Sequence, residues 1–146
     1  MTDREMDALV AEKIMGWVWL RHIVRPSSGQ GYEWMRSLFI PDHKVEPFEE
    51  GTGELGNVPS HGEEPVAIMN APHYSTDLNA AWQVVEKMQT LSWTFTVSGL
   101  RAHIWKAEFM KRTGNVMQDL LSSDSADTAP RAICLAALHA VGVEAK

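Results

Sequence analysis

Apolar residues near the start of the chain recur at intervals of three and four, the spacing of one helix face. They are Met6, Leu9, Val10, Ile14 and Met15. Thr2 and Glu5 precede them with the spacing of a capping box, in which each residue binds the other's backbone. Gly16 follows the last of them. The pattern predicts a first helix that stops at Gly16.

The next part of the chain has the pattern of strands separated by loops. Residues 17–24 are predominantly apolar and aromatic, which favours a strand, and the glycine- and proline-containing run 25–31 ends it. Residues 32–40 are apolar enough to pack, but the segment is too short for periodicity to choose between a helix and a strand. Residues 66–69 are expected to form a short strand.

A second helix is predicted after residue 75. Ser75 or Thr76 is expected to cap it, and Asp77 would lie in its electropositive first turn. The expected buried face consists of Leu78, Ala81, Trp82, Val85 and Met88.

The helix is followed by two segments in which apolar and polar residues alternate, as they do in half-buried strands. Residues 92–98 place Trp93 and Phe95 on the same side, and residues 102–110 repeat the alternation. The intervening Gly99-Leu100 suits a tight turn, so we expect a hairpin. Residues 117–121 are expected to add an edge strand before a polar run.

The last helix is signalled at both ends. Asp127-Thr128 can cap it, Pro130 suits the first turn, and Gly142 suits a left-handed C-terminal cap. Its expected buried face consists of Pro130, Ile133, Cys134, Ala137, Leu138 and Val141. Cys134 is interpreted as a small buried hydrophobe and not as a reactive thiol.

The order of elements predicts an α/β fold of the α+β type. Two or more amphipathic helices and a small, mainly antiparallel sheet can bury their apolar faces only against one another. A length of 146 residues fits one domain, 1–146. Residues 41–65, rich in glycine, proline and glutamate, are expected to form an exposed acidic insertion.

Composition narrows the class of protein. Apolar residues make up 45% of the chain, but the sequence has no run of about eighteen apolar residues, so no membrane-spanning segment is expected. The single cysteine excludes an intrachain disulfide, and a reducing cytoplasm is expected. Segment 42–64 has seven acidic residues and one lysine, so it carries the whole net charge of −6. We therefore expect no nucleic-acid polymer as partner, whereas a small anionic ligand remains compatible.

The sequence contains no motif for a cofactor, a metal or covalent catalysis. Its six histidines lack the spacing of known metal sites, and no nucleophile elbow or phosphate-binding glycine loop is present. We expect a protein that is not an enzyme and needs no cofactor or metal.

Several side chains are candidates for binding an anionic, nucleotide-like ligand. An aromatic ring beside a guanidinium can stack a base and hold a phosphate, and a helix N-terminus attracts anions. The candidates are Trp34, Arg36, Tyr74, Ser75, Arg101, Lys106, Arg112 and Arg131. The alternative structural roles are that Trp34 packs under the insertion, that Ser75 caps its helix, and that the basic set forms the solvated end of the hairpin.

Three separate stretches of the chain resemble one family. They are residues 11–17 (AEKIMGW), 74–88 (with YSTD, AAW and VEKM) and 127–138 (with DTAP and AICLAAL). Together, in this order, they are similar to the phage ABA-sandwich domain family. The resemblance implies a helix–sheet–helix sandwich and a viral origin, whereas residues 20–70 depart from it and no catalytic residue carries over.

The resemblance leads to two functional hypotheses. In the first, a homo-oligomeric anti-defence protein in the cytoplasm of the bacterial host sequesters a cyclic nucleotide or cyclic ADP-ribose-type immune signal without cleaving it. In the second, an accessory module binds a host protein through the acidic insertion.

Overall fold

A computed structural model describes residues 1–24, 33–41, 57–59, 62, 66–68, 71–112 and 119–145. The chain forms two compact units. The first contains Met1–Met15 and Ala71–Lys146, and the second contains Gly16–Asn70. The acidic segment 41–65 belongs to the second unit and lies mostly outside the described residues.

Helix α1 (Asp3–Lys13) begins with the expected capping box. The Thr2 hydroxyl accepts a hydrogen bond from the Glu5 backbone at 3.2 Å, and the Glu5 carboxylate accepts one from the Thr2 backbone at 2.6 Å. Gly16 follows the helix with a φ of 78°, a left-handed conformation in which glycine meets no steric cost. The prediction for this helix is confirmed.

Helix α2 (Leu78–Thr90) is capped by Asp77, so the expected cap at Ser75 or Thr76 is wrong. The Asp77 side chain accepts a hydrogen bond from the Asn79 backbone at 2.8 Å. Ser75 is held by α1 instead, because its backbone N–H donates to Asp7 at 2.8 Å.

The buried face of α2 is also displaced from the expected one. Ala81, Val84, Val85 and Met88 are fully buried, whereas Leu78 and Trp82 are 55% and 48% exposed. Val84 therefore belongs to the buried face of α2, and Trp82, which was expected there, does not. The Trp82 ring still meets Phe95 edge to face, with the ring centroids 5.9 Å apart.

Strands β5 (Thr94–Arg101), β6 (Ile104–Arg112) and β7 (Asp119–Ala126) form an antiparallel sheet in that order. The hairpin turn lies at Ala102-His103, where His103 has a φ of 63°, and not at Gly99-Leu100. The polar run 122–125 belongs to β7, although the sequence placed it after the strand. Ser122 tolerates burial there because its hydroxyl donates to the Ala136 carbonyl oxygen at 2.6 Å.

Helix α3 (Ala129–Ala140) has the expected proline near its start and the expected glycine after its end. Backbone hydrogen bonds from Val143 to Leu138 and from Gly142 to His139 make a Schellman motif around Gly142, whose φ is 84°. Cys134 is fully buried, as predicted, whereas Val141 is 36% exposed.

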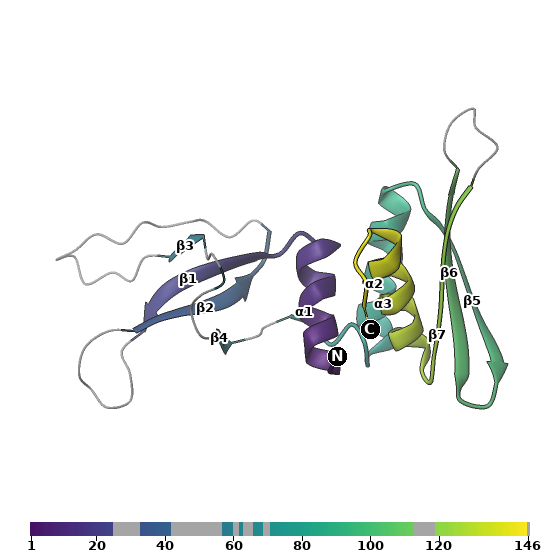
Figure 1. The fold of residues 1–146 in the computed structure, drawn as a ribbon, viewed down its shortest axis with the longest axis horizontal. Helices are drawn as coiled ribbons and strands as arrows, with labels where there is room; N and C mark the ends of the chain where they lie inside the picture. Colours follow the sequence, from purple (N-terminus) through teal and green to yellow (C-terminus); the bar gives the residue numbers. More distant parts are fainter. Residues whose placement is uncertain are drawn as a thin grey trace. The chain divides into compact units, whose positions relative to one another are not determined.

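Within the first unit the three helices lie on one side of the β5–β6–β7 sheet (Figure 1). α3 packs on β6 and β7, α2 packs on α3 and β5, and α1 packs on α3. The core contains Phe109 from the sheet, Ile133 and Leu138 from α3, and Tyr74, all at most 1% exposed. The α+β class with a small, mainly antiparallel sheet is confirmed, although the described strands form two such sheets where one was expected.

The second unit is a four-stranded sheet in the order β3-β1-β2-β4. It comprises β1 (Val18–Val24), β2 (Glu33–Phe39), β3 (Asn57–Pro59) and β4 (Val66–Ile68). Only the β2–β4 pair is parallel. Segment 32–40, which the sequence left open between helix and strand, is thus a strand. In the part of the chain that the structure describes, no helix has the length and apolarity to cross a bilayer.

Candidate functional site

Two tryptophans and two arginines lie on one face of the β1–β2 hairpin. Arg21 of β1 is directly opposite Arg36 of β2. Trp19 precedes Arg21 by two positions and Trp34 precedes Arg36 by two, so all four share a face of the pleated sheet. We call these four residues the Trp–Arg face.

Each guanidinium of the Trp–Arg face stacks on a tryptophan of the other strand. The Cζ atom of Arg36 lies 4.7 Å from the centroid of the Trp19 ring, and that of Arg21 lies 4.8 Å from the Trp34 ring. Stacking occupies the face of a guanidinium, while its N–H donors point outward in the plane. A stacked arginine can therefore still donate two parallel hydrogen bonds to a phosphate.

The Trp–Arg face is partly open to solvent. Trp34 is 37% exposed, and the other three residues are half-buried. The Nε atom of Arg36 is buried and has no hydrogen-bond partner among the described residues. A Cβ atom added to Gly62 would lie 3.9 Å from a terminal nitrogen of Arg36, so the chain passes close to this guanidinium. Arg21 also takes part in a further interaction.

Three other predicted residues lie in a cluster that connects α1, the segment before α2, and α3. Tyr74 is 1% exposed, and burial raises the pKa of its hydroxyl to about 12. The Ser75 hydroxyl donates to the Asp3 carbonyl oxygen at 3.2 Å. Arg131 forms an ion pair with the Asp3 carboxylate. These contacts are all within the protein.

The predicted basic residues of the hairpin are not gathered at one place. Arg101 lies at the turn between β5 and β6, whereas Arg112 is the last residue of the nine-residue strand β6, about 27 Å away along the sheet. Lys106 lies between them and forms an ion pair with Glu108 at 2.6 Å.

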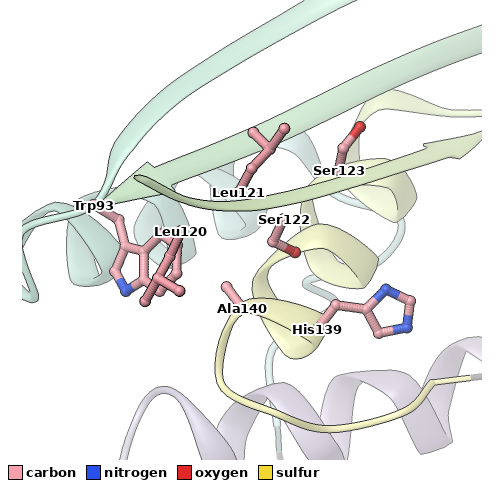
Figure 2. A pocket seen from close by; sticks show the side chains of 7 residues that line it. All are labelled: Trp93, Leu120, Leu121, Ser122, Ser123, His139 and Ala140. Atoms are coloured by element: carbon pink, nitrogen blue, oxygen red, sulfur yellow. The ribbon is translucent and has the colours of Figure 1, made fainter. Parts of the chain in front are cut away.

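A second candidate site is a pocket of about 340 Å³ beside β7 and the end of α3 (Figure 2). This volume lies in the range of small-molecule sites. The lining residues are Trp93, Leu120, Leu121, Ser122, Ser123, His139 and Ala140. In Figure 2 Trp93 and Leu120 lie together at one end and His139 lies at the other.

The imidazole of His139 is positioned by two neighbours. Its Nδ1 atom pairs with the Asp124 carboxylate, and its Nε2 atom accepts a hydrogen bond from the Ala145 backbone at 3.4 Å. A Ser–His–Asp arrangement needs a hydroxyl that donates to the imidazole. The Ser122 hydroxyl instead donates to Ala136, as described above. The Ser122 hydroxyl is therefore not placed as the nucleophile of such an arrangement.

The described residues contain no group of three or more histidine, cysteine or acidic side chains placed to hold a metal ion.

The sequence analysis missed Trp19 and Arg21. Their signal is a repeated Trp-x-Arg pattern, residues 19–21 and 34–36, in two neighbouring segments of apolar character. The sequence analysis selected Trp34 and Arg36 but not their counterparts. The pocket residues Ser123 and His139 carry no such local signal, since a strand and a helix bring them together.

The architecture is that of a small α+β protein with helices layered on an antiparallel sheet. Residues 8–138 match the Phage ABA sandwich domain, and the chain belongs to this family. It is therefore a phage protein, as the resemblance of the three matching stretches implied. Neither a curated protein nor a solved structure matches the chain.

Proposed function

We propose that this phage protein binds a small nucleotide-type immune signal in the cytoplasm of the bacterial host and sequesters it without cleavage. The observation that carries the proposal is the Trp–Arg face, in which two guanidiniums and two indole rings lie together on one sheet. Guanidiniums bind phosphate in a bidentate manner, and indole rings stack on bases of any sequence.

Sequestration, as opposed to turnover, agrees with the chemistry of this face. Its four side chains are two indoles and two guanidiniums. None of these groups is a general base or a nucleophile near neutral pH.

The direct test is a thermal-shift and calorimetric screen of the full chain against cyclic mononucleotides, cyclic dinucleotides and cyclic ADP-ribose. A ligand at 100 times its dissociation constant adds about 2.7 kcal/mol to the free energy of unfolding. We expect at least one member to bind, and Arg36→Gln to weaken its binding. Lys87→Gln, which removes one positive charge from α2, is the matched control and should bind normally.

Three outcomes would contradict the proposal or its site. Absence of binding by every member of the panel contradicts ligand sequestration. Loss of binding in His139→Gln with normal binding in Arg36→Gln moves the site to the pocket beside β7. Recovery of a cleaved ligand after denaturation contradicts binding without turnover.

A homo-oligomer is part of this proposal, carried over by analogy from the first functional hypothesis. Light scattering after size-exclusion chromatography measures the assembly directly. A monomer both with and without ligand would remove this part and leave the binding proposal intact.

A further inference from the structure

The Trp–Arg face has an internal two-fold pattern. Each of its strands contributes the same triplet, a tryptophan, one intervening residue and an arginine. The intervening residues are Leu20 and Met35, whose side chains belong to the opposite face of the sheet.

The register of β1 and β2 turns this repeat into a local symmetry. Neighbouring antiparallel strands are exchanged by a two-fold axis that passes midway between two opposite residues. Arg21 and Arg36 are such a pair. The same axis therefore exchanges Trp19 with Trp34, and the two cation–π stacks have matching lengths of 4.7 and 4.8 Å.

This symmetry narrows the class of ligand, and the inference rests on the function proposed above. We infer that the Trp–Arg face binds a cyclic dinucleotide, with one phosphodiester at each of Arg21 and Arg36 and the bases directed toward Trp19 and Trp34. A cyclic dinucleotide has two phosphodiesters and two bases related by its own two-fold axis. A cyclic mononucleotide has one of each and would fill half of the arrangement.

The charges agree with two phosphodiesters. Arg21 and Arg36 are opposite one another, but Arg21 stacks toward Trp34 and Arg36 toward Trp19, so the two guanidiniums lean along the sheet in opposite directions. Two phosphodiesters place one negative group at each guanidinium, whereas a single phosphodiester reaches only one of them. The two tryptophan rings differ in solvent access, since Trp34 is 37% exposed and Trp19 is half-buried.

The test compares four probes by calorimetry on the full chain: cyclic di-AMP, its guanine analogue, the linear dinucleotide with the same bases as cyclic di-AMP, and cyclic AMP. We expect cyclic di-AMP or its guanine analogue to bind at least about tenfold more tightly than cyclic AMP. Arg21→Gln and Arg36→Gln should each weaken cyclic dinucleotide binding by about 10- to 100-fold, and by similar factors. Lys87→Gln should have no effect.

Conservative variants separate a lost contact from a lost fold. Arg21→Lys and Arg36→Lys keep the charge but lose the planar fork, so each should bind more weakly than wild type while its circular dichroism stays unchanged. Trp34→Leu should weaken binding through lost stacking.

The outcomes distinguish this inference from the proposed function. Cyclic AMP binding as tightly as both cyclic dinucleotides, or strongly unequal effects of Arg21→Gln and Arg36→Gln, overturns the two-fold ligand and leaves nucleotide binding standing. No binding of any nucleotide overturns both. Tight binding of a cyclic dinucleotide that all five variants of Arg21, Arg36 and Trp34 leave unchanged overturns the assignment to the Trp–Arg face.

Discussion

The carboxylate of Asp7 accepts a hydrogen bond from the backbone N–H of Ser75 at 2.8 Å, across 68 residues of the chain. Asp7 is fully buried, and its other carboxylate oxygen accepts a hydrogen bond from the Arg4 guanidinium at 2.9 Å. Arg4 also donates to the Ala71 carbonyl oxygen at 2.9 Å. These bonds connect α1 to the segment that leads into α2, so the first helix is part of the helical layer.

Replacing Asp7 should destabilise the fold, and the loss should grow with the number of buried hydrogen-bond donors that lose their acceptor. Asp7→Ala leaves the buried Ser75 N–H and the Arg4 guanidinium without their acceptor, and should lower the free energy of unfolding by about 3 kcal/mol. Asp7→Asn keeps an oxygen for Ser75 and should cost less. Urea denaturation measures both variants. Equal stability of Asp7→Ala and wild type would show that the contact contributes nothing.

Tyr74 should make the protein sensitive to alkaline pH. Burial raises the pKa of its hydroxyl from 10.0 to about 12, so the folded state keeps a proton that the unfolded chain loses. The contribution is fully present below pH 10 and is lost as the pH rises toward 12, by about 2 kcal/mol in all. Denaturation at several pH values measures it. Tyr74→Phe should lack this slope, and identical slopes in both proteins would refute the assignment.

Cys134 should be unreactive in the folded protein. Its side chain is fully buried in α3, and burial raises the pKa of the thiol well above its usual range. A chromogenic disulfide reagent should therefore label no thiol under native conditions and one per chain in denaturant. Rapid labelling at neutral pH without denaturant would mean that α3 opens readily or that the thiol is accessible.

Gly142 should be sensitive to replacement for a reason confined to the backbone. Its φ is 84°, and a Cβ atom added to it would meet nothing within 4 Å. Gly142→Ala should therefore cost about 1 kcal/mol of left-handed strain with no steric clash, and Gly142→Asn should cost less. Thermal unfolding measures the difference. Gly99→Ala is the control, because Gly99 lacks a positive φ and its added Cβ makes ordinary contacts with Trp105. Similar losses at both positions would contradict a backbone origin.

Several elements were readable from the sequence because their determinants are local. The capping box of Thr2 and Glu5 and the glycine after α3 involve residues a few positions apart, and their hydrogen bonds form within one turn. The alternation in β5 and β6 follows directly from the two-residue period of a strand.

The prediction was wrong where a distant partner changed the local preference. Ser75 does not cap α2: its hydroxyl donates to the Asp3 carbonyl oxygen of α1, and its backbone N–H donates to Asp7. The polar run 122–125 is a strand because it pairs with β6, and the buried Ser122 hydroxyl finds an acceptor on α3. A loop and a strand with polar side chains look alike until such a partner is known.

The same distinction between local and distant determinants applies to the candidate site. The sequence by itself determined the terminal helices, the hairpin and the position of the acidic segment, and it selected Trp34 and Arg36 as candidates. Only the tertiary structure decided that Trp19 and Arg21 complete their face, and that Tyr74, Ser75 and Arg131 are engaged inside the protein. The physical reason is that strand register and helix packing determine which distant side chains meet. The spacing of neighbouring residues in the sequence does not determine either of them.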